Sequence, residues 1–472
     1  MLCRTSWQTG AAVLASWVAA FGGAQAGQTY YVDADASGST LDGSSWCEAF
    51  VTLQEALDEA SSTDTILVAD GVYIPESGHL ADPRDATFQL KSGVEIYGGY
   101  AGCGAGDPGE RAPWLFETVL SGDLDGNDET GGTNSENVLH VVNGSGVAST
   151  AVLDGVTITG GNANGADQKG RGAGVYCVNG SPTLVGCRIT NNWAKRYCGF
   201  YNFEGRPTLT NCVIAGNATQ YNCAGFYDGS TGLLNFATLT NCLIKNNDAG
   251  GSAGAVYTYG TSTRLINTTI VGNTAPSIGG VYVGPLSTAR ITNCILWGNE
   301  YLEDDIRQGQ LFVQGAAVLS DSCVEGWDDD PLIGTNIFDD DPLFVPGPLG
   351  CYYLSQTAAG DPEDSPCFDA GGETATEAGL DDLTTRSDEV PDDAASDVDV
   401  GYHYPITDEA LVMGDYDRTG DVTLDDYAEL VDCLTGPGPD EVSPCCRIFD
   451  YQPDEDVDLA DFAEFAVDLD TP

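Results

Sequence analysis

Basic side chains are scarce in this sequence. Its 472 residues include 17 Lys and Arg against 72 Asp and Glu, a formal net charge of −55. A surface of this sign repels phosphate, which excludes nucleic acid as a partner. Only three histidines occur, His79, His140 and His403, and they lie far apart in the sequence. Their separation suggests neither a zinc-ligand set nor a histidine-containing catalytic triad.

Long apolar runs are also rare. The one centred on residues 11–20 follows Arg4 and precedes Ala24-Gln25-Ala26. This order is typical of a secretory signal peptide, here residues 1–26, with cleavage after Ala26. No later stretch is long and apolar enough to span a bilayer. We therefore expect an exported protein, secreted or held at the extracellular surface, with no transmembrane segment.

Cysteine is plentiful, and fifteen cysteines follow the predicted leader. Disulfides are permitted in an exported chain, and the odd number leaves at least one thiol without an intramolecular partner. We expect bonds between Cys47 and Cys103, between Cys351 and Cys367, and between Cys433 and either Cys445 or Cys446. Four others recur at one place in a repeat, where parallel Cβ vectors favour a ladder of buried thiols: Cys187, Cys212, Cys242 and Cys294.

An internal repeat organises the middle of the chain. A phrase of the form Cys/Thr-x-Ile/Leu-x-x-Asn ends at Asn162, Asn192, Asn217, Asn247, Asn273 and Asn299. Successive copies are 25 to 30 residues apart, a period typical of a solenoid whose coils bury their apolar faces against one another. Alternation places Cys and Ile inside and Asn at a corner, where stacked amides can bond along the axis.

A second phrase keeps step with the first and ends in Tyr176, Tyr201, Tyr227, Tyr257 and Tyr282. Each Tyr follows an inward Val or Phe, so we expect the rings to point outward as an aromatic stripe. Packing between stacked rings explains such a stripe, and sugar rings also stack on aromatic faces. The packing explanation is the simpler one.

These motifs resemble bacterial secreted right-handed parallel β-helix proteins with pectate-lyase-like or polymorphic outer-membrane-protein-like repeats. The resemblance rests on Trp46–Leu57, on Val94–Tyr100 and on the Gly-Val-Tyr and Ile-x-Gly-Asn rungs, and it covers about residues 29–405. It implies a mainly β, single-stranded parallel β-helix. The family includes enzymes, adhesins and many members of no known activity.

The expected domain order follows from these segments. Residues 27–116 form an N-terminal cap with a helix within Phe50–Ala60 and the first strands, and residues 117–372 form the rungs. Residues 373–410 are a closing coil and acidic linker, and residues 411–472 form a small helical module. Within the rungs, Asp123–Gly132 is rich in oxygen ligands; it could hold calcium, although such a loop is more often a solvated turn.

The C-terminal module contains two candidate calcium loops. The first fits a twelve-residue loop, with glycine at place 6 and a helix directly after it. Its ligands would be Asp415, Asp417, Thr419, Asp421, Thr423 and Asp426. The second has Glu455 where the glycine belongs, so we expect weaker binding there. Its ligands would be Asp450, Gln452, Asp454, Asp456, Asp458 and Asp461.

Two such loops with Asp at place 12, each opening into a helix, resemble a dockerin type I module. The resemblance implies calcium as a cofactor and a cohesin-like or cell-surface protein as a partner. The partner-contacting places would be Leu424, Asp425, Leu459 and Ala460. The two loops are unlike each other, and cysteines are inserted between Cys433 and Cys446; both features depart from the dockerin pattern and put cohesin binding in doubt.

One basic cluster stands out. Residues 155–300 hold nine basic and five acidic side chains, whereas the rest of the chain holds eight and 67. Lys169, Arg171, Lys195 and Arg196 should meet on neighbouring rungs beside Tyr176 and Tyr201. We expect this group to contact an anionic polysaccharide. The alternative is that the four are loop charges solvated by water.

The sequence identifies no catalytic residues. Only Glu204 and Asp228 lie at comparable places on adjacent coils, as a pair of glycosidase carboxyls would. The leading interpretation is therefore an exported β-helix scaffold with a calcium-binding, dockerin-like tail, acting in glycan binding or surface attachment. The alternative is a polysaccharide lyase or glycoside hydrolase displayed through that tail.

Overall fold

The computed structural model describes residues 27–127, 136–232, 236–301, 309–327 and 334–407. In the C-terminal part it describes residues 412–416, 422–423, 426–427, 430, 433–434, 444–451, 457 and 459–468. The predicted leader, residues 1–26, lies outside this set. Among the described residues, no helix has both the length and the hydropathy needed to cross a bilayer.

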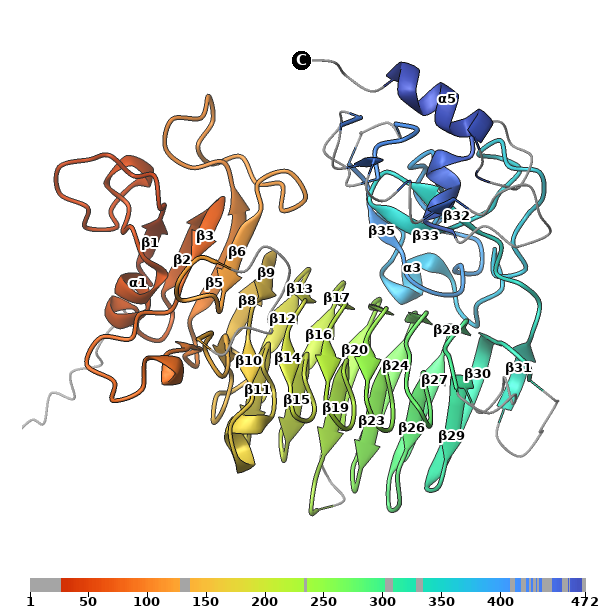
Figure 1. The fold of residues 1–472 in the computed structure, drawn as a ribbon, viewed down its shortest axis with the longest axis horizontal. Helices are drawn as coiled ribbons and strands as arrows, with labels where there is room; N and C mark the ends of the chain where they lie inside the picture. Colours follow the sequence, from red (N-terminus) through yellow and green to blue (C-terminus); the bar gives the residue numbers. More distant parts are fainter. Residues whose placement is uncertain are drawn as a thin grey trace, which may run out of the picture.

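The chain winds into a right-handed parallel β-helix whose coils stack strand on strand (Figure 1). The largest sheet takes two strands from each regular coil. The first-leg strands are β8 (Val152–Asp154), β12 (Thr183–Val185), β16 (Thr208–Thr210), β20 (Phe236–Thr240), β24 (Ser262–Ile266) and β27 (Thr288–Thr292). The second-leg strands are β9 (Val156–Thr159), β13 (Arg188–Thr190), β17 (Val213–Ala215), β21 (Leu243–Lys245), β25 (Thr269–Val271) and β28 (Ile295–Trp297).

Two further sheets close each coil. The longer one consists of β4 (Phe88–Gln89), β7 (Val142–Asn143), β11 (Val175–Val178), β15 (Phe200–Phe203), β19 (Phe226–Gly229), β23 (Val256–Tyr259), β26 (Val281–Val283) and β29 (Leu311–Val313). The shorter one consists of β10 (Asn162–Ala163), β14 (Trp193–Ala194), β18 (Ala218–Thr219) and β22 (Asp248–Ala249). The predicted solenoid is thus confirmed.

The register between coils is constant, which is why the repeat is visible in the sequence. Leu184 pairs with Leu209, Leu209 with Leu239, and Leu239 with Leu265. All four side chains are fully buried inside the coil. Because a one-residue slip would turn each of them outward, this leucine column fixes the pairing.

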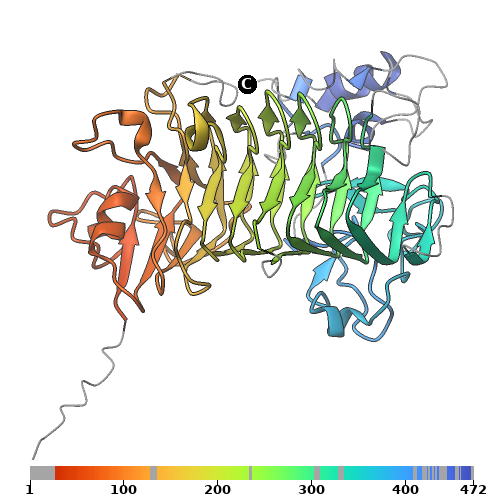
Figure 2. The same cartoon turned by 90° about the horizontal axis from the view of Figure 1, so that it is seen from below.

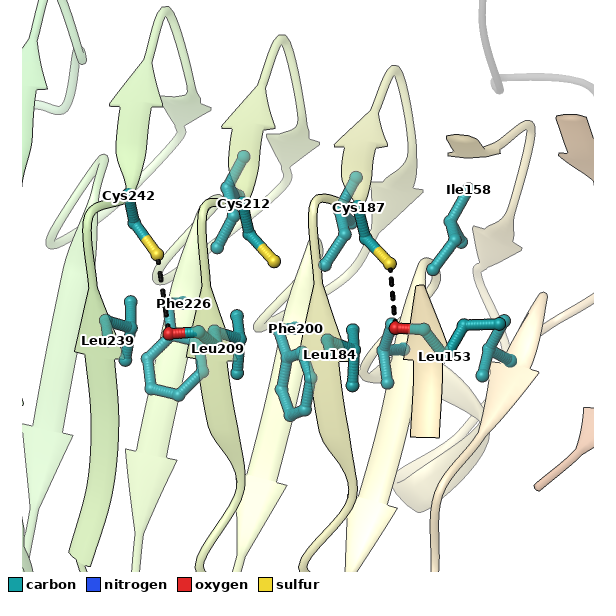
Figure 3. Packing of buried hydrophobic residues seen from close by; sticks show 14 of the residues in the cluster. Leu153, Ile158, Leu184, Cys187, Phe200, Leu209, Cys212, Phe226, Leu239 and Cys242 are labelled. Atoms are coloured by element: carbon teal, nitrogen blue, oxygen red, sulfur yellow. Dashed lines mark hydrogen bonds between the residues drawn. The ribbon is translucent and has the colours of Figure 1, made fainter. Parts of the chain in front are cut away.

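The thiol ladder is also confirmed. Cys187, Cys212 and Cys242 are buried free thiols whose side chains point into the coil (Figure 3). The Sγ of Cys212 donates to the carbonyl of Thr210 at 3.3 Å. Thr268 occupies the same place one coil further on, and its hydroxyl donates to the carbonyl two residues before it at 3.0 Å. The place therefore selects a small side chain with a donor rather than cysteine itself.

Buried asparagines form a second ladder at the corner that follows. The Nδ2 of Asn192 donates to Asn217 at 3.0 Å, and the Nδ2 of Asn217 donates to Asn247 at 2.9 Å. The series continues through Asn273 to Asn299 at 2.9 Å per step. Each amide also binds backbone carbonyls, so these buried polar groups are satisfied along the axis.

The N-terminal region, called the cap below, supplies the first strands of the largest sheet. Strands β1 (Thr29–Val32), β2 (Thr65–Ala69) and β5 (Glu95–Tyr100) pair in parallel up to β8, and β3 (Gly71–Tyr73) and β6 (Thr118–Ser121) pair in parallel up to β9. The region also contains the short helices η1 (Trp46–Glu48) and η2 (Pro83–Asp85). The predicted helix is α1 (Leu53–Glu59), which begins after a reciprocal capping box between Thr52 and Glu55. The expected Cys47–Cys103 disulfide joins η1 to the loop that follows β5.

The parallel stack ends earlier than residue 372. Its last strands in the described chain are β30 (Ala316–Val324) and β31 (Gly334–Phe338). Residues 341–407 instead form a covering layer on the outside of the coil, seen beside the rungs in Figures 1 and 2. It contains the antiparallel pairs β32 (Phe344–Gly347) with β33 (Gly350–Leu354) and β34 (Leu383–Thr384) with β35 (Tyr404–Pro405), and α3 (Ala375–Ala378).

The covering layer is attached by a segment that runs along the coil axis. The backbone nitrogen of Gly401 donates to the carbonyl of Asn293, and that of Tyr402 donates to Oγ1 of Thr269. The backbone nitrogen of His403 then donates to Asn241 at 2.7 Å. The segment thus crosses three coils in reverse chain order. It is a structural strap rather than the surface linker that its composition predicted.

One predicted disulfide is wrong. Cys351 bonds to Cys445 and not to Cys367, whereas Cys433 bonds to Cys446, one of the two partners expected. Cys367 is instead a buried free thiol in the apolar cluster that contains Cys323. The Cys351–Cys445 bond ties the C-terminal module, with η4 (Cys446–Phe449) and α5 (Leu459–Asp468), to the covering layer.

Candidate functional site

The predicted basic residues lie in stacked loops at one corner of the first regular coils. Arg171 follows the short helix η3 (Asp167–Gly170), and Arg196 follows β14. The two are paired as neighbours in adjacent coils. A backbone bond of 3.0 Å from Arg196 to the carbonyl of Gly170 fixes this stacking. The expected meeting of the two basic loops is therefore observed.

A cavity of about 270 Å³ opens between these loops. Arg171, Lys195 and Arg196 line it, together with Asp167 and Tyr221. Among the described residues, none of these three cations has a carboxylate oxygen within 4.0 Å of a side-chain nitrogen. Three cations and one carboxylate, that of Asp167, therefore border one hollow in a strongly acidic protein.

The fourth predicted cation has a different role. Lys169 forms an ion pair with Asp85 of η2 and is not among the described residues that line the cavity. Both side chains are largely exposed. The pair links the loop of η3 to the N-terminal cap and adds little stability in water.

Arg171 is held in place by aromatic rings. Its Nη1 donates to the hydroxyl of Tyr201 at 3.0 Å, and its guanidinium carbon lies 5.6 Å from the Tyr201 ring centroid and 5.8 Å from that of Tyr197. Cation–π contact and the hydrogen bond together fix the guanidinium direction. A fixed guanidinium loses little freedom when it binds an anion.

The aromatic stripe exists, but its first rings are buried. Stacked centroid distances are 5.5 Å from Tyr176 to Tyr201 and 5.3 Å from Tyr201 to Tyr227. Tyr197, with a positive φ of 56°, folds over the stripe and stacks on Tyr227 at 3.8 Å. Tyr176 and Tyr201 are only 8% and 3% exposed, so their ring faces offer no platform to a sugar.

Tyr221 is the exposed ring that the sequence analysis missed. It is 45% exposed and lies under Arg196, whose guanidinium carbon is 5.3 Å from the ring centroid. The repeat contained the signal: Arg196 follows Asn192 by four residues, and Tyr221 follows Asn217 by four. The two therefore occupy equivalent places on successive coils.

Glu204 and Asp228 do not form a pair of glycosidase carboxyls. Asp228 is fully buried inside the coil, where it accepts hydrogen bonds from Asn202 at 2.7 Å and Thr263 at 2.8 Å. Burial raises the pKa of Asp228 to about 6. Glu204 accepts hydrogen bonds from Ser230 and Thr231 in a neighbouring loop. A carboxyl inside the packed coil cannot reach a polysaccharide.

A buried Asp–His–Asp cluster lies beneath the strap. The Nε2 of His403 is 3.1 Å from Oδ2 of Asp392, and ligand atoms of these two and Asp399 lie within 4.8 Å of one another. Both oxygens of Asp399 already accept hydrogen bonds, from Asp369, Gln356 and Thr385. Burial, and then repulsion from Asp392, raises the pKa of Asp399 to about 6. These bonds give the cluster a structural role in holding the strap.

The candidate calcium loops are described only in part. Asp417, Thr419, Asp421, Gln452, Asp454, Asp456 and Asp458 lie outside the described residues, as do the partner-contacting places Leu424 and Asp425. In the first loop, Asp426 accepts hydrogen bonds from the backbone nitrogens of Tyr416 at 2.7 Å and Thr423 at 2.8 Å. The last ligand position of the loop, Asp426, therefore lies beside its second residue, Tyr416.

The described ligand positions suit an oxygen-bound cation. The Asp415 and Asp426 carboxylates are 4% and 0% exposed, and in the second loop Asp461 is 1% exposed. Carboxylates stay buried when they are paired or coordinate a metal, and both oxygens of Asp426 already accept hydrogen bonds from Tyr416 and Thr423. The other candidate calcium ligands among the described residues are Thr423 of the first loop and Asp450 of the second. Calcium binding stays a prediction.

A known family matches residues 36–279, just over half of the chain, and is described as a protein of unknown function, DUF1565. This chain belongs to the DUF1565 family. The match covers the N-terminal cap and the coils that carry the basic cavity. No curated protein matches the chain.

Several solved structures are similar to this DUF1565 protein. Pectate lyase Pel9A is 13% identical, with a TM-score of 0.43, over 81% of this chain and 97% of that one. A rhamnogalacturonan lyase is 13% identical, with a TM-score of 0.34, over 68% and 91%. A pectin methylesterase from Aspergillus niger is 15% identical, with a TM-score of 0.30, over 67% and 92%. At these values the likeness says nothing about activity.

Proposed function

We propose that this DUF1565 protein is an exported β-helix scaffold that binds an anionic polysaccharide at the cavity of Arg171, Lys195 and Arg196. The observation that carries the proposal is the convergence of three cations without carboxylate partners among the described residues. In a chain of net charge −55, these cations form a local positive site that attracts an anion.

The arrangement suits a carboxylated or sulfated sugar. A guanidinium binds a carboxylate through two parallel hydrogen bonds, and the fixed Arg171 is ready to do so. The exposed Tyr221 ring offers an apolar face beside the charges, which suits the carbon–hydrogen face of a pyranose ring. Tyr221 thus takes the stacking role that the sequence analysis gave to Tyr176 and Tyr201.

The C-terminal module completes the proposal. We infer that it binds calcium through Asp415 to Asp426, and more weakly through Asp450 to Asp461, as a dockerin-like tail. A tail of this kind would attach the scaffold to a cohesin-like or cell-surface protein. Buried carboxylates at the described ligand positions support calcium, whereas the partner rests on the sequence resemblance alone.

The test is binding to an array of acidic polysaccharides, including polygalacturonate, by the double variant Lys195→Ala with Arg196→Ala. We expect affinity to fall by roughly tenfold or more, because two charge-assisted contacts are lost. The matched control is Arg264→Ala with Arg290→Ala, a pair in register on β24 and β27 that does not line the cavity. Equal binding by the two double variants would sink the proposal.

A further inference from the structure

A second, larger cavity lies further along the stack and begins on the coil that follows the one carrying Tyr221. It has a volume of about 420 Å³ and forms where the last coils, the covering layer and the C-terminal module meet. The coils contribute Asn246 and Trp297, and the covering layer contributes Asp341 and Tyr352. Tyr416 and Arg447 come from the C-terminal module. Its volume falls within the range of small-molecule sites, which often occur between domains.

Covalent and polar contacts hold the parts of this cavity together. Cys445, itself part of the lining, is bonded to Cys351 of the covering layer. The Nη1 of Arg447 donates to the carbonyl of Phe344 at 3.2 Å, which fixes the guanidinium against β32. The Tyr416 ring stacks on Phe449 with centroids 5.7 Å apart. The lining side chains are therefore set in position before a ligand arrives.

Two glycines keep the coil side of the cavity open. Gly272 and Gly298 line it and have positive φ angles of 62° and 60°. A Cβ at Gly272 would lie 2.6 Å from the side-chain oxygen of Asn246. Larger residues here would strain the backbone and fill the space beside Trp297.

The chemistry of the lining matches a sugar. Two partly exposed aromatic rings, Trp297 and Tyr416, provide apolar faces. Tyr352 is only 7% exposed, and Phe344 and Lys245 cover its ring, so it shapes the wall of the cavity. Planar polar groups that bind hydroxyls come from Asp341, Arg447 and Asn246. Asp341 and Arg447 have opposite charges, so the cavity favours neither sign among the side chains that line it. This distinguishes it from the basic cavity, where the cations outnumber Asp167.

We infer that this cavity is a second carbohydrate site, which takes a neutral oligosaccharide. The inference deepens the proposed function, on which it rests, by giving the scaffold two sites of different charge preference. The site needs the C-terminal module in place, since Tyr416 and Arg447 belong to it. Binding of neutral sugar is therefore coupled to the module and to its bond with the covering layer.

The test is calorimetric titration of the full chain with cellohexaose and xylohexaose as probes. We expect at least one to bind, and Trp297→Ala to lower its affinity by about tenfold or more, since the half-buried ring that would stack on the sugar is lost. Trp297→Phe keeps a ring and should retain most of the affinity. Arg264→Ala, which changes a residue that lines neither cavity, should leave neutral binding unchanged.

Two results would overturn the inference: no binding of either hexasaccharide, or binding that survives Trp297→Ala. Arg447→Ala gives a second variant on the module side, in case Trp297→Ala does not fold. Acidic-polysaccharide binding is measured on the same variants. If acidic-polysaccharide binding is lost only in the Lys195 and Arg196 double variant, the proposed function stands. If the natural protein at the same time binds neither neutral hexasaccharide, the second site is ruled out.

Discussion

Single side chains inside the coil show why the repeat tolerates some substitutions and not others. The Cys212 thiol and the Thr268 hydroxyl do the same task in successive coils, each donating to the carbonyl two residues before it. Asn217 donates to both a neighbouring amide and a backbone carbonyl and accepts from Asn192. Beyond Asn299 the amide oxygen of Gln310 takes the accepting role. The corner therefore requires a side-chain amide, whereas the adjacent inward place accepts either a thiol or a hydroxyl.

Asp228 predicts a measurable pH dependence. Its folded-state pKa of about 6 lies above the ordinary value of 3.8, because burial disfavours the charged form. The folded protein therefore holds this proton more tightly than the unfolded chain. Its contribution to stability is complete below about pH 4 and is lost as the pH rises through 6, a change of about 3 kcal/mol.

The Asp228→Asn variant tests this directly, because the amide imitates the protonated carboxyl. We expect the difference in unfolding free energy between variant and natural protein to shift in favour of the variant between about pH 4 and pH 7. Denaturant unfolding at both pH values measures it. The pKa of Asp399 is also raised, but this residue is present in both proteins, so its contribution cancels in the difference of unfolding free energies. A difference independent of pH would contradict the assignment.

At the scale of elements, the C-terminal module and the coil have separate cores. Val422, Leu430, Ile448, Phe449 and Phe465 form a small apolar cluster of the module, distinct from the cluster inside the coil. The cluster has seven buried members among the described residues of the module. We expect calcium and the two disulfides that involve its cysteines to support this core.

Calcium removal should therefore act on the module and not on the coil. We expect chelation to expose residues 411–472 to proteolysis and hydrogen exchange while the coils stay protected. The Cys351–Cys445 bond would keep the loosened module attached. Returning calcium should restore protection, whereas magnesium serves as the control cation because it fits such loops poorly. A single melting transition whose temperature does not change with calcium would contradict this prediction.

The repetitive elements could be predicted from the sequence, and the irregular ones could not. Inward Leu and Ile, corner Asn and stacked Tyr recur because each coil faces an identical neighbour. Nothing periodic marks Tyr197, whose positive φ turns it over the stripe and buries Tyr201. The strap at Gly401–His403 was hidden for the same reason, since its partners are more than a hundred residues away.

The basic cavity shows the same division. Period and charge together predicted that the loops of Arg171 and Arg196 would meet. The ion pair of Lys169 with Asp85 depends on how the cap folds over the first coil, which no repeat specifies. The Cys351–Cys445 bond likewise depends on where the module lies, so the sequence could not distinguish Cys445 from Cys367 as the partner.

At the scale of the whole molecule, the distribution of charge sets how an acidic glycan would approach. The molecule has a net charge of −55, yet residues 155–300 hold more basic than acidic side chains. A polyanion is repelled at long range and attracted at short range. The Debye length, roughly 30 Å at 0.01 M salt and 10 Å at 0.1 M, decides which range dominates.

This competition predicts a maximum in the salt dependence of acidic-polysaccharide binding. At about 0.01 M salt the glycan feels the whole acidic surface, and at about 1 M the attraction of the cavity is itself screened, so affinity should be highest near 0.1 M. In the Lys195→Ala, Arg196→Ala double variant most of the local attraction is gone. Its weak binding should then show no maximum, because screening only removes repulsion.

Titrating the salt concentration at fixed pH therefore separates local recognition from general adhesion. The Arg264→Ala, Arg290→Ala control changes the net charge by the same amount as the cavity variant, from −55 to −57, so it should keep the maximum. If the affinity of the natural protein falls steadily as salt is added, the predicted maximum is wrong. That result would mean that the acidic groups lie too far from the cavity to weaken glycan binding.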